Sequence, residues 1–99
     1  MKRHLSHENP IHLTEEQIEI LYRAQKLDSL LTVTERRVAR FATLGHANKE
    51  IAIMLSISPK TVGRHIESIT NKARRVYGSH ASFRNLTVPE LHAYYFLID

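Results

Sequence analysis

Signals for the start of a helix recur along this 99-residue chain and divide it into short helices. A threonine is followed three residues later by glutamine or glutamate at 14–17, 32–35 and 87–90. In such a capping box each of the two side chains accepts a hydrogen bond from the backbone amide of the other residue. Ser58 followed by Pro59 is a fourth helix start. Proline is tolerated at the first helical position, because the N–H that it lacks would have no partner inside the helix. No stretch alternates apolar and polar residues long enough to predict a strand, so we expect an all-α fold.

The spacing of the apolar residues sets the extent of the expected helices. We expect helices over about 15–29, 33–44, 49–55, 59–75 and 88–97, a three-residue turn at 56–58, and a loop or frayed turn at 79–86. In the fourth of these helices the inward side is predicted from the helical spacing of Val62, Ile66, Ile69 and Ala73. The first helix carries apolar residues on several faces, which indicates contact with more than one neighbour.

Positive charge is concentrated in the middle of the chain. Residues 32–84 contain ten basic and three acidic side chains, a net charge of +7, whereas the segments on either side are slightly acidic. A basic segment of this kind is typical of proteins that bind a polyanion, most often nucleic acid. An ordinary solvated basic face is the alternative, and charge alone does not separate the two.

The residue types argue against an enzyme and against a cofactor or metal site. The chain has no cysteine, which excludes disulfides and thiolate ligands, and its three glycines are too scattered for a phosphate-binding loop. The histidines at 4, 7 and 12 lie in a polar arm over 1–12 that we expect to be mobile and solvated. No apolar run approaches the roughly 20 residues that cross a bilayer, and no secretory signal is visible, so we expect a cytoplasmic protein without membrane contact.

The helices expected at 49–55 and 59–75 form a helix-turn-helix candidate, a motif whose second helix enters the DNA major groove. At about 100° per residue, the side opposite the inward stripe is an exposed ridge made of Lys60, Arg64, Glu67, Asn71 and Arg75. Arginine and lysine donate to guanine, glutamate accepts from cytosine, and asparagine pairs with adenine. We expect Lys60, Thr61 and Arg64, near the helix start, to lie closest to the bases.

This part of the chain resembles the LuxR/GerE-type helix-turn-helix, the output domain of NarL/FixJ-type response regulators. The family pattern reads LTxREx…G…SNKEIAxxLxISxxTVKxHxxxIxxKL, and the resemblance covers about residues 31–73. It rests on Leu31, Thr32, Glu35, Gly45, 48–52, 55–58, Thr61, Val62, His65, Ile69 and Lys72. The resemblance implies four helices, the third in the major groove and the fourth for dimerisation, and a transcription factor on a two-fold symmetric site. One extra N-terminal helix precedes them here, so we divide the chain into 1–30, 31–78 and 79–99.

The resemblance also implies roles for individual residues. Lys49 matches the lysine of the family's second helix, Thr61, His65 and Lys72 match positions that face the DNA backbone, and Gly63, Arg64 and Glu67 fall where members vary to read bases. The complete predicted DNA-binding set is Lys49, Lys60, Thr61, Arg64, His65, Glu67, Ser68, Asn71, Lys72 and Arg75. In the last helix Leu91, Tyr94, Tyr95 and Ile98 are expected to form a homodimer interface, to which the helix at 15–29 can add, with closure of the chain's own core as the alternative.

The chain departs from the family pattern at several positions, and Gly63, Ala47 and Glu67 keep a second interpretation open. Thr34 replaces an arginine, Ala47 replaces a serine and moves the expected cap to Asn48, and Gly63 replaces a lysine. The last helix also arrives roughly eight residues late. The chain is therefore expected to be a DNA-binding regulator, with double-stranded DNA and a second copy as partners, and the N-terminal helix as a place where a regulatory protein docks. The alternative is a helix-turn-helix-derived interaction module that sequesters another regulator.

Overall fold

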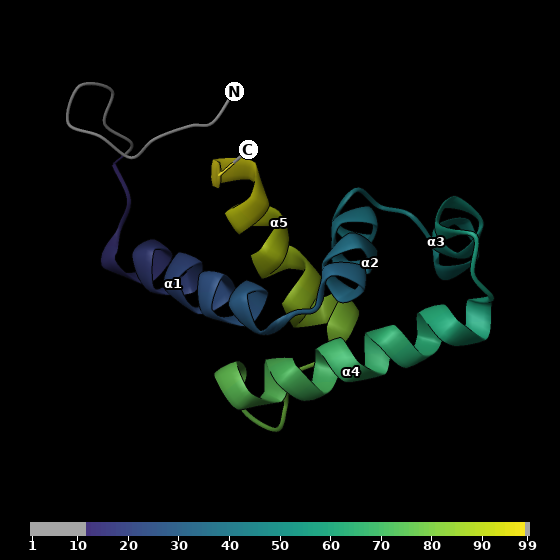
Figure 1. Cartoon of the computed structure of the whole chain (residues 1–99). Helices are drawn as coiled ribbons and strands as arrows, with labels where there is room; N and C mark the ends of the chain where they lie inside the picture. Colours follow the sequence, from purple (N-terminus) through teal and green to yellow (C-terminus); the bar gives the residue numbers. More distant parts are fainter. Residues whose placement is uncertain (1–11, 99) are drawn as a thin grey trace.

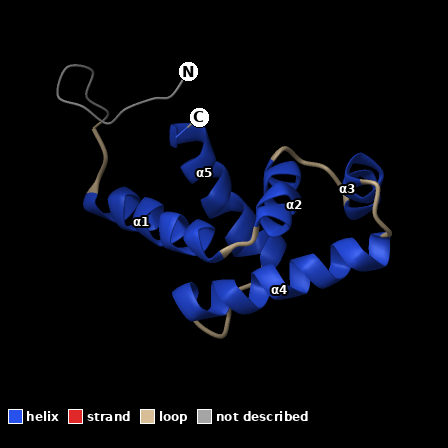
Figure 2. Cartoon of the chain, viewed as in Figure 1, coloured by secondary structure: helices blue, strands red, loops and turns tan. Residues whose placement is uncertain are grey.

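The computed structural model describes residues 12–98, which form five α-helices and one π-helical turn (Figure 1). The elements are α1 (Glu15–Leu30), α2 (Val33–Thr43), α3 (Asn48–Leu55), α4 (Pro59–Tyr77), the turn η1 (Phe83–Thr87) and α5 (Val88–Ile98). Over this range the chain contains only helices, turns and loops (Figure 2), which confirms the all-α prediction and the extra N-terminal helix. The predicted arm lies, except for His12, outside the described residues.

Two of the three predicted capping boxes form as expected. Thr14 Oγ1 accepts from the Gln17 amide at 3.1 Å, and Gln17 Oε1 accepts from the Thr14 amide at 2.9 Å. Thr32 and Glu35 make the same reciprocal pair, at 3.2 and 2.8 Å. Each box satisfies amides that have no partner inside the helix, and so fixes where α1 and α2 begin.

The third predicted capping box is wrong. The chain is already helical from Phe83, because the amides of both Leu86 and Thr87 donate to the Ser82 carbonyl and form a π-turn that runs directly into α5. The Thr87 hydroxyl is buried and has no hydrogen-bond partner, so it caps nothing. The loop expected over 79–86 therefore ends at Ser82.

The start of α3 also differs from the prediction. Ala47, not Asn48, is the N-cap residue, and its amide donates to Glu50 Oε1 at 2.8 Å. Asn48 is the first helical residue, and its side-chain oxygen accepts from Arg84 of η1 at 2.8 Å. Arg84 thereby ties the C-terminal part of the chain to the start of the helix-turn-helix.

Every helix contributes to one apolar core. Figure 1 shows α5 between α1 and α2, α4 running beneath these three helices, and α3 beside the N-terminal end of α4. The core includes a fully buried side chain from each of the five helices, namely Leu27, Val38, Ile51, Ile69 and Leu91. The helix-turn-helix therefore shares its core with both terminal helices, α1 and α5.

Candidate nucleic-acid interface

The predicted three-residue turn at 56–58 is confirmed. α3 ends at Leu55, and Ser56 takes the left-handed conformation with φ 56° and ψ 42°. Ser58 then caps α4, since its hydroxyl accepts from the Thr61 amide at 3.0 Å, and Pro59 occupies the first helical position. The tight turn gives α4 its direction relative to α3.

The inward side of α4 is the one that the spacing predicted. Val62, Ile69 and Ala73 are fully buried, and Ile66 is half-buried against the same core. The opposite ridge is exposed at all five predicted positions, which are Lys60, Arg64, Glu67, Asn71 and Arg75. Burial of one stripe leaves the ridge as the face of α4 that can meet a partner.

The N-terminal end of α4 carries cations and no acid. Lys60 and Arg64 are exposed in its first two turns, whereas the first carboxylate on the helix is Glu67. The partial positive charge of the helix start adds to these side chains and favours a negatively charged partner. Thr61 is half-buried, and its hydroxyl lies 2.9 Å from that of Ser58. The contact that the structure shows for this side chain is therefore with the N-cap of α4.

The remaining predicted contacts of this face differ in exposure. Lys49 is exposed on α3, and His65 is half-buried on the flank of α4. Asn71 is exposed, and its side-chain oxygen accepts from Arg74 at 3.2 Å, which holds the amide in place on the ridge. These side chains lie around the start and middle of α4, as expected for an interface with this helix at its centre.

Lys72 and Ser68 have partners inside the chain. Both donate to the buried carboxylate of Glu35, the lysine at 2.5 Å to Oε1 and the serine at 2.5 Å to Oε2. Glu35 is only 4% exposed. Lys72 and Ser68 therefore hold α4 against α2, and we do not count them among the proposed DNA contacts.

The protonation of Glu35 reflects this arrangement. Burial by itself raises the pKa of the carboxyl group, but hydrogen bonds from Lys72, Ser68 and the Thr32 amide, together with the lysine charge, outweigh it. The net result is a pKa of about 2, so the carboxylate is ionised at neutral pH. The sequence identifies Glu35 as a capping residue and as part of the family pattern, but its pairing with positions 68 and 72 depends on how α2 crosses α4.

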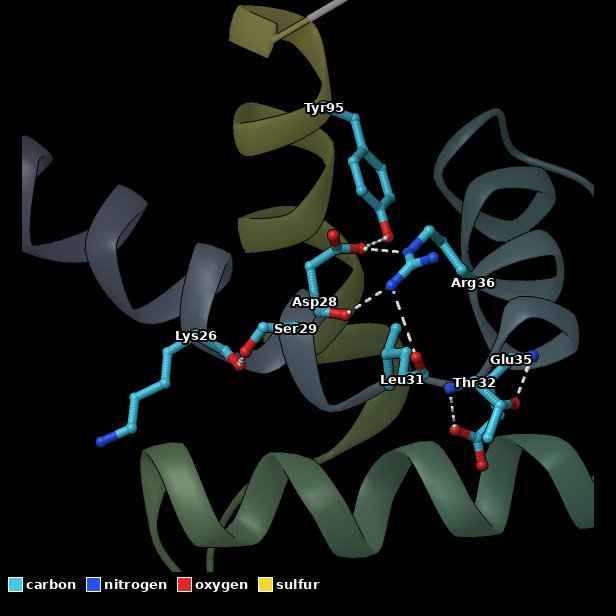
Figure 3. Close-up of polar contacts among 8 residues, drawn as sticks. All are labelled: Lys26, Asp28, Ser29, Leu31, Thr32, Glu35, Arg36 and Tyr95. Carbon is cyan, nitrogen blue, oxygen red and sulfur yellow. Dashed lines mark hydrogen bonds and ion pairs between the residues drawn. The ribbon is translucent and has the colours of Figure 1, made fainter.

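A second polar cluster joins α1, α2 and α5 around the carboxylate of Asp28 (Figure 3). Tyr95 donates its hydroxyl to Asp28 Oδ1 at 2.7 Å, and Arg36 Nε donates to the same oxygen at 3.2 Å. Arg36 also donates to the backbone carbonyls of Asp28 and Leu31. The guanidinium of Arg40 lies 4.2 Å from the centre of the Tyr95 ring. Burial and the Asp28 carboxylate raise the pKa of Tyr95, so the phenol stays protonated.

This cluster corrects part of the predicted dimer surface. Leu91 is fully buried and Tyr95 is 4% exposed, so both close the core of their own chain, which was the alternative interpretation. Tyr94 and Ile98 are half-buried and line an apolar groove between α1 and α5. Of the four residues, only these two remain available to a second copy.

Within residues 12–98 no three histidine, aspartate or glutamate side chains cluster as metal ligands, and His4 and His7 lie outside the described residues. None of the helices in this range combines the length and apolar character needed to span a bilayer.

Comparison with known protein families assigns the central helices. The family described as bacterial regulatory proteins, luxR family, matches residues 29–74. The match covers a little under half of the chain and agrees with the resemblance found in the sequence. The matched residues contain α2, α3 and most of α4. Comparison with curated proteins and with solved structures gave no match.

Proposed function

We propose that this chain is a sequence-specific DNA-binding transcription regulator whose helix α4 reads base edges in the major groove. The observation that carries the proposal is the exposed ridge of α4, which lies opposite a stripe packed into the core and within the residues that match the luxR family. An α-helix fits the major groove, where each base pair presents its own pattern of donors and acceptors. Such a regulator acts in the cytoplasm, where bacterial DNA is found.

Side chains on the ridge divide into base-reading and phosphate-binding groups. Arg64 lies one turn into α4 with an exposed guanidinium, which suits bidentate donation to guanine. Glu67 is the acceptor for a cytosine amino group one turn later. Lys60, at the start of α4, lies with Arg64 nearest the bases, whereas Arg75 and the exposed Lys49 of α3 contact phosphates. Thr61, His65 and Asn71 complete the contact set.

We further propose that the regulator binds DNA as a homodimer. Two copies related by a two-fold axis present two equivalent α4 helices to successive major grooves, and this arrangement matches a palindromic site. The binding of two equivalent half-sites supplies the affinity that the small face of one α4 helix lacks. A site selected from random DNA by the protein is expected to be palindromic for this reason.

The proposal is tested by selecting duplexes from a random-sequence pool and measuring affinity for a selected and a scrambled duplex by fluorescence anisotropy. Replacing Arg64 with alanine is expected to reduce the ratio of the affinities for the selected and the scrambled duplex by about 5- to 150-fold, because one bidentate base contact is lost. Arg23→Ala is the matched control. It removes one arginine from α1, where the side chain pairs with Glu19 at 3.4 Å and is not part of the ridge of α4, so the difference in affinity should stay unchanged.

Two outcomes would contradict the proposal. If no duplex is enriched and all duplexes bind with the same weak affinity, α4 does not read sequence. If the wild-type protein does not bind DNA at low salt, the basic ridge serves another purpose, and the interaction-module alternative replaces the proposal.

A further inference from the structure

An apolar groove of about 320 Å³ lies between α1 and α5. Its walls include Leu13, Ile18, Leu21 and Tyr22 of the N-terminal part and Tyr94 and Leu97 of α5. Ile18 remains 53% exposed and Tyr22 65% exposed. Large apolar side chains left in water beside a groove mark a surface that another molecule covers.

Two opposite charges flank these exposed apolar residues on the same face of α1. At about 100° per residue, Glu15, Ile18, Tyr22 and Lys26 fall within a quarter-turn of one another. Both charged side chains are exposed, and within residues 12–98 neither has an ion-pair or hydrogen-bond partner for its charged group. Figure 3 shows the Lys26 side chain extending away from the Asp28 cluster.

Glu15 and Lys26 are too far apart to pair within one helix. Eleven residues separate them, which corresponds to about 16 Å along the axis. The acidic end and the basic end of this face therefore need a partner that presents the reverse order of charges.

We propose that this face of α1 is the contact between two copies of the chain, with the two α1 helices antiparallel about a two-fold axis. Self-pairing of one patch is the interface type that a two-fold axis produces. The midpoint between Ile18 and Tyr22 is residue 20, and the midpoint between Glu15 and Lys26 lies half a residue further along. One register consequently places Ile18 against Tyr22 of the second copy and Glu15 beside Lys26 of the second copy, twice over.

The charge order favours a second copy over an unrelated regulatory protein on the same face. Glu15 and Lys26 of one copy are the oppositely charged partners of Lys26 and Glu15 of the other copy. A second copy of the chain therefore pairs all of these charges, and no further property of a partner is needed. Part of the apolar wall comes from Tyr94 and Ile98 of α5, the two predicted dimer residues that the core leaves available. The inference rests on the dimeric state proposed above and adds its surface and register.

Sedimentation velocity of the full chain without DNA, from about 1 to 500 µM at low salt, tests the inference. The wild type is expected to dimerise in the micromolar range, as small interfaces do. Glu15→Lys and Lys26→Glu are each expected to weaken the dimer by about tenfold, because two attractions become two repulsions. The double variant restores both pairs in reverse and should return to within about threefold of the wild type.

Glu16→Lys is the matched control. It makes the same charge change in the same first turn of α1, but about 100° round the helix from Glu15 and off the proposed contact. Its dimerisation should equal that of the wild type. Tyr22→Ser, which removes the aromatic ring from the contact, should abolish the dimer over the measured range.

Each failure has a separate meaning. A chain that stays monomeric but binds a selected duplex overturns the inference and leaves DNA binding standing. A dimer that responds equally to Glu15→Lys and Glu16→Lys, or that the double variant does not restore, uses another surface. If the chain is monomeric and Tyr22→Ser lowers its melting temperature, the groove is covered by residues of the same chain. The inference is then wrong.

Discussion

Glu35 at the start of α2 accepts a hydrogen bond from Lys72 in α4, 37 residues further along the chain. The carboxylate is buried, and the lysine side chain is 23% exposed, so the ion pair lies beneath the surface and behind the exposed ridge of α4. It fixes the distance between the two helices at the level where α4 is expected to lie in the groove. The orientation of the recognition face thus depends on a pair of residues that does not belong to it.

We predict that stability falls in acid through Glu35. Its folded pKa of about 2 lies below the ordinary value of 4.5, so the ionised group stabilises the fold above about pH 4.5, and this contribution is lost as the pH falls toward 2. The shift corresponds to the order of 3 kcal/mol at neutral pH. Urea unfolding should show a stability gap between wild type and Glu35→Gln that shrinks by more than half from about pH 7 to about pH 3.

The exposed Glu67 supplies the control for this pH dependence. Glu67→Gln removes a carboxylate from the surface of α4, where the structure shows no hydrogen bond or ion pair for it. Its stability relative to the wild type should not vary with pH. A gap that is constant for Glu35→Gln, or that varies equally for both variants, would contradict the role assigned to the buried carboxylate.

Lys72 and Arg64 should separate into a structural and a recognition role. Lys72→Met leaves a buried carboxylate without its cation and is expected to lower the free energy of unfolding by about 1–3 kcal/mol. Arg64→Met changes an exposed side chain and should stay within about 0.5 kcal/mol of the wild type, while weakening binding to a selected duplex. Chemical denaturation and DNA titration of both variants check this. Equal stability of the two proteins would mean that the Glu35 pair does not hold α4.

Gly63 offers a stabilising substitution. It lies inside α4, is exposed, and a side chain there would meet no atom within 4 Å. Gly63→Ala should therefore raise the free energy of unfolding by about 0.5–1 kcal/mol, because glycine loses more backbone freedom in a helix. Gly63→Lys restores the lysine of the family pattern and should steepen the salt dependence of binding to random DNA by about one unit. A lysine variant with unchanged salt dependence would place this face of α4 away from phosphates.

Two adjacent tyrosines give a paired test of the Asp28 cluster. Tyr95→Phe removes the hydroxyl that donates to Asp28 and should cost about 1.5–3 kcal/mol, as expected for a buried hydrogen bond to a charged group. Tyr94→Phe removes a hydroxyl for which the structure shows no hydrogen bond, and should cost less than about 0.5 kcal/mol. Thermal or urea unfolding compares them, and the reverse order of stabilities would reject the geometry of Figure 3.

The helix-turn-helix was predictable because its signals are local. The caps at Thr32 and Ser58, the turn at 56–58 and the buried stripe of α4 each depend on residues within one or two helical turns. The same rule failed at Thr87, where a capping-box pattern occurs inside a chain segment that is already helical. A local pattern cannot report whether the preceding residues have already formed a turn.

The parts of the site that sequence reasoning missed are contacts between distant segments. Lys72 lies on the flank of α4, where a helical wheel allows either a phosphate or Glu35 as its partner, and only the packing of α2 decides. The sequence favours Leu91 and Tyr95 as a dimer surface, whereas both residues are buried in the core of their own chain. Asp28 gave no signal at all, since its partners come from two other helices.

The Asp28 cluster and the hydrogen bond from Arg84 to Asn48 determine which segment can be transferred into another protein as a folded unit. The luxR-family match spans 29–74, but Leu27 before it and Leu91 after it are fully buried in the same core, and Asp28 before it receives hydrogen bonds from α2 and α5. A fragment cut at the ends of the match would expose that core to water. An engineered fusion that uses α4 must therefore include the flanking helices α1 and α5, because the three helices share one core.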